Sequence, residues 1–165
     1  MGGGQASLDG IEVFPAEFDD LKAILALQYI AYQSEAKLVN NPSIPPLRET
    51  LDDIEAQYRE GTVFLKAADS EGVIIGSVRG REENGTLYIG KLIVHPEQQG
   101  KGIGSLLLRE METHCPLPRY ELFTSDKSVR NISLYERLGY MRFEERQIAP
   151  DLRFIYLEKL KANNG

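Results

Sequence analysis

The sequence has no tryptophan, one cysteine and two histidines among its 165 residues. A single cysteine, Cys115, cannot form a disulfide framework within the chain, so an oxidising compartment is not implied. With so few histidines and cysteines a zinc site would need carboxylates, and no ligand spacing supports one. We therefore expect no bound metal, and we expect Cys115, which precedes Pro116, to be a helix-end residue rather than a nucleophile.

An excess of positive charge is also absent, because 19 lysines and arginines face 25 acidic residues and give a net charge of −6. Sequence-independent binding to nucleic acid requires many cationic side chains on phosphates, and attraction to anionic membranes requires them as well. The longest apolar runs fall far short of the roughly 20 residues that a membrane span needs. The N-terminus lacks the basic and apolar regions of a signal peptide. We expect a cytoplasmic protein with no nucleic-acid or membrane partner.

What remains is an ordinary globular composition, with 42% hydrophobic and 27% charged residues. The length predicts about one domain. Residues 1–9, which include three consecutive glycines, are expected to be a disordered leader or a tag remnant, and residues 10–162 a single domain.

The hydrophobic pattern and the turn residues predict alternating strands and helices. In chain order the expected elements are a strand at 11–14, helices at 18–32 and 46–61, strands at 62–67, 73–78 and 86–94, a helix at 101–114, a strand at 120–124, a helix at 128–138 and strands at 140–146 and 152–157. The proline-rich residues 36–47 are expected to form a loop. The helix before the strand at 120–124 implies a parallel crossover. The order βααβββαβαββ predicts a mixed α/β domain with a mostly antiparallel sheet and a central parallel pair.

Three glycines, Gly100, Gly102 and Gly104, lie where a predicted strand meets a predicted helix. A helix N-terminus presents unpaired amide donors and a positive dipole end, and glycines let an anion approach the backbone closely. This arrangement predicts a phosphate cradle. The Walker pattern fails because His95 and Gly102 occupy its required glycine and hydroxyl positions, and the dinucleotide spacing of glycines also fails.

The segment Gln99-Gly-Lys-Gly-Ile-Gly104 resembles the pyrophosphate loop of the GNAT superfamily of N-acetyltransferases, Q/R-x-x-G-x-G/A. Downstream, Asn131-Ile-Ser-Leu-Tyr-Glu-Arg-Leu-Gly-Tyr140 is similar to that family's second motif, which places an asparagine and a tyrosine on one helix and ends in a glycine and an aromatic residue. The two motifs stand in the family's order, and the predicted elements match its order too. The resemblance therefore implies a GNAT-like fold.

The resemblance implies acetyl-CoA as cofactor and a primary amine, on a small molecule or a peptide, as the acceptor that attacks directly in a ternary complex. The loop amides would hold the pyrophosphate, with Lys101 adding charge at the rim, and the strand edge near residues 92–94 would pair with the pantetheine arm. The implied cofactor-binding residues are Leu92, Ile93, Val94, Gln99, Gly100, Lys101, Gly102, Ile103, Gly104, Ser105, Asn131 and Tyr135.

Two catalytic groups follow from the same resemblance. A backbone N–H at Ile93 or Val94 would face the thioester oxygen and stabilise the negative charge that develops there. Tyr135 matches the family tyrosine that protonates the leaving thiolate, a role that a phenol with an ordinary pKa of ~10 can fill at neutral pH.

The base and the acceptor are less determined by the residues. Many relatives place a glutamate on the strand before the loop, but residues 87–91 contain no carboxylate. The base is then a water relay or a residue of the segment 33–47 such as Glu35. Tyr29, Tyr32, Glu35 and Tyr88 are the candidate substrate contacts, and carboxylates near the cleft would favour a cationic acceptor.

Other functions stay open at this point. The missing strand carboxylate is also consistent with a non-catalytic acyl-CoA sensor or interaction domain, and the glycine loop alone is consistent with a nucleotide-phosphate binder. Edge strands near the C-terminus could pair two copies into a homodimer.

Overall fold

The computed structural model describes residues 7–161, and residues 1–6 and 162–165 lie outside this range. Its elements are β1 (Ser7–Leu8), β2 (Ile11–Pro15), η1 (Phe18–Asp20), α1 (Leu21–Ala31), α2 (Gln33–Leu38), α3 (Pro45–Arg48), α4 (Leu51–Arg59), β3 (Val63–Ala68), β4 (Ile74–Glu83), β5 (Thr86–Val94), η2 (Pro96–Gln98), α5 (Ile103–His114), β6 (Arg119–Ser125), α6 (Val129–Arg137), β7 (Met141–Ala149) and β8 (Leu152–Leu160). Every predicted strand and helix is present, in the predicted order.

Two local expectations are wrong. The segment expected to be a loop contains α2 and α3, because the backbone continues from α1 into α2 with Ala36 N–H bonded to the Tyr32 carbonyl. Two of the prolines that suggested a loop, Pro45 and Pro46, begin α3. Proline is tolerated there because the N–H groups in the first turn of a helix have no hydrogen-bond partner within the helix. The leader expected over residues 1–9 is too long, because Ser7 and Leu8 pair with β2 as β1, while residues 1–6 lie outside the described range.

All strands belong to one sheet with the order β1-β2-β3-β4-β5-β6-β8-β7. Every neighbouring pair is antiparallel except β5 and β6, which are parallel. The helix α5 provides the crossover between these two strands, as the order of elements predicts. The predicted mixed sheet with a central parallel pair is therefore confirmed.

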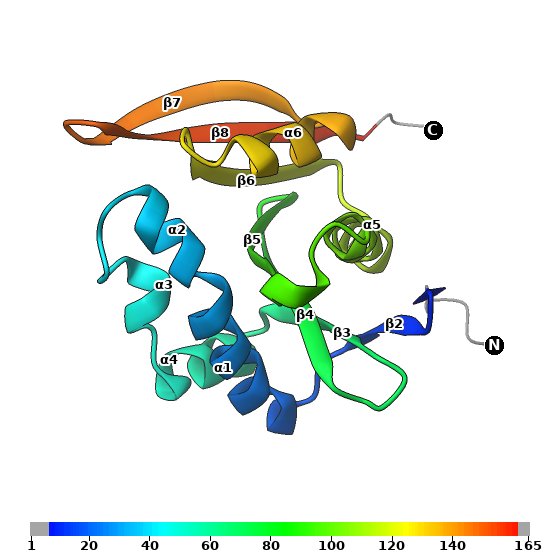
Figure 1. Cartoon of the computed structure of the whole chain (residues 1–165). Coiled ribbons are helices and arrows are strands. Elements are labelled where there is room, and N and C mark those ends of the chain that lie inside the picture. Colours follow the sequence, from blue (N-terminus) through cyan, green and yellow to red (C-terminus); the bar gives the residue numbers. More distant parts are fainter. Residues whose placement is uncertain (1–6, 162–165) are drawn as a thin grey trace.

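Helices cover the sheet from both sides (Figure 1): α1 and α4 lie on one face of β3–β5, and α5 lies on the other. The first side is held by a hydrophobic cluster of α1, α4 and β3 that includes the fully buried Leu21 and Ile54. The second side is the larger core, in which α5 and α6 pack on the sheet through residues such as Leu107 and Ile132. Within residues 7–161, no helix has the length and apolar character to span a membrane.

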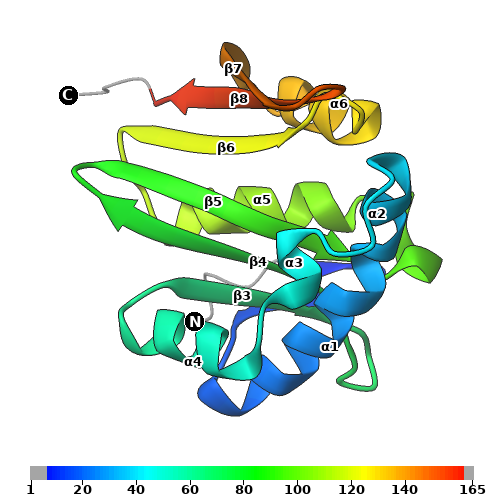
Figure 2. The same ribbon diagram turned by 90° about the vertical axis from the view of Figure 1, so that its left-hand side faces the viewer.

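The sheet opens between its two parallel strands. β5 and β6 pair only at residues 86–88 and 119–121, although β5 runs on to Val94 and β6 to Ser125. Each strand keeps its outer neighbour beyond that point, β4 for β5 and β8 for β6. The two strands therefore diverge toward their C-terminal ends, where α2 and the start of α5 lie (Figure 2). This opening positions the candidate site.

Candidate functional site

The glycine loop ends in a row of unpaired amides at the start of α5. Gly100 and Gly102 have φ angles of 81° and 86°, in the left-handed region that glycine enters at little cost. The amide N–H groups of Gly102 to Ser105 have no acceptor among the described residues, as the first turn of a helix leaves them. Lys101 lies at the rim, where its Nζ donates to Gln98 Oε1 at 2.8 Å. The loop thus presents several donors and a helix dipole to an anion.

A cation from α6 joins this loop. Arg130 Nη1 donates to Gln99 Oε1 at 2.9 Å, and its Nη2 lies 4.0 Å from the position that a Cβ on Gly100 would take. An arginine here adds positive charge where the amides converge. The motifs did not single it out, and the only signal in the sequence is its place directly before Asn131.

The open edge of β5 continues from the loop. His95 N–H bonds to the Ile75 carbonyl of β4 at 2.8 Å. Pairs in an antiparallel ladder alternate between bonded and non-bonded, so Ile93 faces β4 in a bonded pair with Ser77, whereas the Val94 N–H points away from β4 into the opening. Of the two predicted backbone donors, Val94 is the one available to a bound group.

Tyr135 lies beyond this edge on the inner face of α6. The residue is only 6% exposed, and its ring packs beside Tyr140 with the centroids 6.2 Å apart. Burial raises the pKa of the Tyr135 hydroxyl above its ordinary value, and the Glu35 carboxylate acts in the same direction. The phenol therefore keeps its proton at neutral pH. No acceptor for this hydroxyl is found within residues 7–161. Every described side-chain N or O atom that is fully sealed from solvent has a partner, so this hydroxyl is not fully sealed.

Glu35 and Tyr32 approach Tyr135 from the helices α1 and α2. Ser128 Oγ, at the start of α6, donates to Glu35 Oε1 at 2.7 Å. Burial raises the pKa of Tyr32, which lies between the two helices, and the nearby Tyr135 hydroxyl adds to that rise. The α1–α2 segment therefore closes over one end of the opening and brings three of the predicted residues together.

Two further members of the predicted set take different positions. Asn131 lies on α6 one turn before Tyr135, where its Nδ2 reaches Thr124 Oγ1 on β6 at 3.5 Å. Tyr29 instead donates its hydroxyl to the Glu49 carbonyl at 2.5 Å, which ties α1 to the segment before α4.

A cleft of about 510 Å³ lies on the α4 side of the opening. Its lining residues are Gln57, Glu60, Thr62, Arg79, Arg81, Tyr88, Ile89, Gly90, Lys91, Glu121, Leu122, Phe123 and Tyr156. A Cβ added to Gly90 would meet no atom within 4 Å, so Gly90 leaves the floor of the cleft open. Tyr88, one of the candidate substrate contacts, is among the lining residues of this cleft, and the Arg81 guanidinium lies over its ring, 5.1 Å from the centroid.

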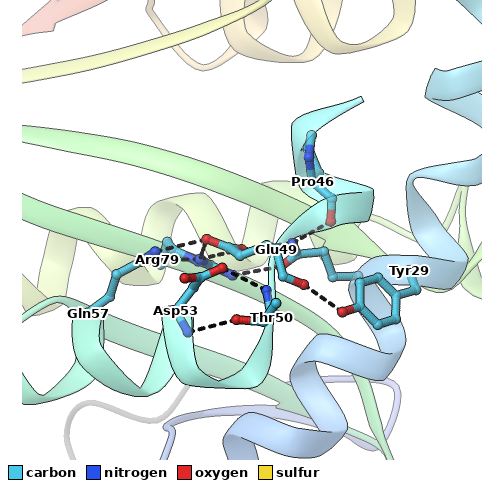
Figure 3. Close-up of polar contacts among 8 residues, drawn as sticks. Tyr29, Pro46, Glu49, Thr50, Asp53, Gln57 and Arg79 are labelled. Carbon is cyan, nitrogen blue, oxygen red and sulfur yellow. Dashed lines mark hydrogen bonds and ion pairs between the residues drawn. The ribbon is translucent and has the colours of Figure 1, made fainter. Parts of the chain in front are cut away.

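A buried polar network holds the helices against this cleft (Figure 3). Arg79 of β4 is 7% exposed, and it bonds to Glu49 at 3.1 Å, to Gln57 at 2.9 Å and to Gln28 at 2.7 Å. Burial alone would raise the pKa of Glu49, but the Arg79 charge and the two glutamine amides hold it below the ordinary value. The network joins α1, α4 and β4, and its charges are satisfied internally.

Beside Arg79, the strand β5 contains an extra residue. Ser77 and Arg79 of β4 oppose Ile93 and Gly90, so two steps on β4 correspond to three on β5. Lys91 takes up the extra residue with a φ of 49°. Such a bulge turns side chains of the strand to a new direction, and here Lys91 lies in the cleft lining next to Gly90. No group of three His, Cys, Asp or Glu side chains in residues 7–161 is placed to hold a metal ion.

Known proteins resemble this chain in sequence and in fold. The model of the acetyltransferase (GNAT) family matches residues 24–140. UPF0157 protein YqkA of Bacillus subtilis is 30% identical over 132 residues, which cover 79% of this chain and 37% of that protein. N-acetylaspartate synthetase of Xenopus tropicalis is 30% identical over 145 residues, or 82% of this chain and 53% of that protein. The chain thus spans between about a third and a half of the length of these relatives.

Among solved structures, the PaiA N-acetyltransferase of Thermoplasma acidophilum in complex with coenzyme A is similar in fold. The TM-score is 0.76 at 17% identity, and the match covers 92% of this chain and 99% of that one. At this identity the likeness concerns the fold alone.

Proposed function

The chain belongs to the GNAT family of acetyltransferases, and from this premise we propose that it transfers an acetyl group from acetyl-CoA to a primary amine held in the same ternary complex. The observation that supports the proposal most strongly is the row of unpaired amides from Gly102 to Ser105, which adjoins the open edge of β5. A phosphate ligand and an extended amide-bearing arm would satisfy both at once.

The residues of the opening fit acetyl-CoA by their chemistry. The amides of the loop, with Arg130 and Lys101 beside them, would hold the pyrophosphate. The unpaired edge of β5 would bind the pantetheine arm in the manner of an added strand. When bound, acetyl-CoA supplies the acetyl group: the amine nitrogen bonds to the carbonyl carbon as the C–S bond breaks, the amine loses one proton, and the sulfur gains one.

The chain's own groups have distinct parts in this proposal. The Val94 N–H would donate to the carbonyl oxygen where negative charge develops, and a fixed donor of this kind is worth a large factor in rate. Tyr135 would supply the proton that the sulfur gains, since burial keeps its phenol protonated. The charge of the Glu35 carboxylate acts on Tyr135, and we propose that Glu35 accepts the proton of the amine, directly or through water.

The acceptor is proposed to be a small molecule or a peptide amine in the 510 Å³ cleft that Gly90 lines. The name of the Xenopus relative, N-acetylaspartate synthetase, supports a small-molecule acceptor. The chain spans only part of the length of these relatives. The acceptor class inferred from the name of the relative is therefore a proposal for this chain.

The test is an assay of acetyl-CoA consumption over a broad panel of amines. Free thiol is measured as CoA is released, and the acetylated amine is identified by its mass increase. We expect release that depends on the amine. Binding of CoA without acetylation of any amine would favour instead a non-catalytic acyl-CoA sensor.

A further inference from the structure

Lys91 occupies the junction of two clefts. It lines the 510 Å³ cleft together with Gly90, and it also lines a second cleft of about 270 Å³, whose other lining residues are Pro45, Arg48, Glu49 and Asp53. The bulge in β5 places it there, because the ladder with β4 shifts between Gly90 and Ile93 and Lys91 takes up a φ of 49° within that shift. Lys91 therefore lies on the floor of the acceptor region, three residues before the Val94 amide.

The other cations around the larger cleft are neutralised by neighbours. Arg79 pairs with Glu49 at 3.1 Å and Arg81 with Glu83 at 2.6 Å. Lys91 differs, because no carboxylate lies within 4.0 Å of its Nζ and no hydrogen-bond acceptor is found for it among the described residues. Burial and then the Arg79 charge lower the pKa of Lys91, while Glu49 acts in the opposite direction. The ammonium is thus partly desolvated without a partner, and a bound anion would supply one.

The carboxylates of the larger cleft do not cancel this charge. Glu121 pairs with Arg119 at 2.9 Å, and Glu60 is exposed at the end of α4, on the rim. In the smaller cleft, Asp53 accepts from the Thr50 N–H at 2.8 Å and serves as a cap of α4. The local charge that faces a ligand on the cleft floor is therefore positive, although the whole chain carries a net charge of −6.

The opposite wall of the cleft is aromatic. Phe123 of β6 and Tyr156 of β8 stack with their centroids 5.3 Å apart, and Phe123 is 50% exposed. Tyr88 adds a third ring to the lining. A Cβ added to Gly90 would meet no atom within 4 Å, so Gly90 leaves room in the same cleft whose lining includes Lys91 and these rings.

We propose that the acceptor is a primary amine that also carries a carboxylate, as an α-amino acid does, with its carboxylate bound to Lys91 and its carbon skeleton lying against Phe123 and Tyr156. This inference rests on the proposed function, because it names the substrate class of the same site. It replaces the sequence-based expectation of a cationic acceptor, since the unpaired charge on the cleft floor is a lysine.

The experiment compares amines that differ by one carboxylate. The pairs are L-phenylalanine and phenethylamine, L-leucine and 3-methylbutylamine, and glycine and methylamine, each assayed for kcat/KM with acetyl-CoA at saturation. We expect the carboxylated member of each pair to be preferred by about 10- to 100-fold, the range for a hydrogen bond to a charged group. We also expect L-phenylalanine to be preferred over glycine because of the aromatic wall.

The variant Lys91→Met should remove this preference by lowering kcat/KM for the carboxylated member alone. Lys22→Met, at an exposed lysine on α1, is the matched control and should keep the preference. Equal rates for both members of every pair in the wild-type protein would overturn the inference, as would a preference that survives in Lys91→Met. CoA binding without acetylation of any carboxylated amine would also overturn it. Absence of CoA binding is a different outcome, which would overturn the proposed function itself.

Discussion

Tyr135 combines burial with a hydroxyl that has no partner among residues 7–161, and this combination suits it to donate a proton. Its neighbour Tyr140 is also buried, but its hydroxyl donates to Glu112 Oε2 at 2.8 Å and is therefore already engaged in the core. We therefore expect the two tyrosines, five residues apart, to have different roles: Tyr135 in proton transfer and Tyr140 in holding the core.

This difference gives a matched pair of substitutions. Tyr135→Phe should lower kcat by at least about 100-fold, the low end for loss of a general acid, with little change in acetyl-CoA affinity or melting temperature. Tyr140→Phe should lower the melting temperature because it removes a bond to a buried carboxylate, and it should keep most of the kcat. Steady-state kinetics and thermal unfolding separate the two. An unchanged kcat in Tyr135→Phe, with chemistry shown to be rate-limiting, would remove Tyr135 from the proposed role.

Arg130 lies beside the glycine loop, where we expect it to contact the cofactor. Its replacement by alanine should weaken acetyl-CoA binding by about 10-fold, because one charge-assisted contact to a phosphate is lost. Arg137, which is exposed on the same helix and bonds to Ser133, is the control, and Arg137→Ala should leave the affinity unchanged. Calorimetric titration of both variants provides the comparison. Equal affinities would show that Arg130 serves only to hold Gln99.

The motif residues of the site could be predicted from the sequence, but their partners could not. The glycine loop and Tyr135 are recognisable because each motif lies within one short stretch of chain. Arg130 meets the loop only after α6 folds beside α5, across a separation of about thirty residues that carries no pattern. The choice of Val94 over Ile93 likewise depends on the pairing with β4.

Among the elements, β5 does most to form the site. Its first residues pair with β6, its last residues have a free edge, and a bulge between them turns Lys91 toward the cleft. The hydrophobic pattern predicts neither the point at which β5 stops pairing with β6 nor the bulge opposite β4. Both features depend on the register between neighbouring strands. The sequence also did not predict α2, because the prolines and asparagines that follow it indicated a loop over residues 36–47.

A larger side chain at Gly90 should narrow the cleft without disturbing β5. Gly90→Val adds a side chain where no atom lies within 4 Å, so we expect acetyl-CoA affinity and stability to be retained. The KM for the acceptor should rise by about 10-fold or more, since the new side chain fills the cleft. Gly76→Val is the contrasting variant, because its Cβ would lie 3.0 Å from Leu107 Cδ1 and should lower the melting temperature. An unchanged acceptor KM in Gly90→Val would place the acceptor elsewhere.

The network around Arg79 predicts a pH dependence of stability. Because the pKa of Glu49 is lowered in the folded protein, its carboxylate stabilises the fold above the ordinary glutamate pKa of about 4.3, and this contribution is lost as the pH falls below it. Glu49→Gln should therefore lower the free energy of unfolding by about 3 kcal/mol at pH 7, since it leaves the buried Arg79 without its countercharge.

The difference from wild type should shrink as the pH falls below about 4. Urea unfolding at pH 7 and pH 3 measures it. Glu55→Gln removes only a surface pair with Arg59 at 4.0 Å on the same helix, so it should change stability by less than about 1 kcal/mol at either pH. A Glu49→Gln effect that is equal at both pH values would contradict the assigned countercharge.

For the molecule as a whole, the order of elements was predictable and the charge distribution was not. Periodicity and turn residues are local, so they gave the strands, the helices and the parallel crossover. Carboxylates near the cleft, in keeping with the net charge of −6, suggested a cationic acceptor, but folding pairs Glu49 and Glu121 with arginines and leaves Lys91 without a carboxylate partner. We therefore expect local dipoles and single side chains, rather than the average charge, to determine which anions this surface binds.

The central claim is that the opening between β5 and β6 is a site for acetyl-CoA. Calorimetric titration of the purified protein with acetyl-CoA, and in parallel with ATP and NAD, tests it most directly. We predict binding of one acetyl-CoA per chain and no comparable binding of the two nucleotides. Absence of acetyl-CoA binding up to millimolar concentration, or equal binding of ATP or NAD, would contradict the account.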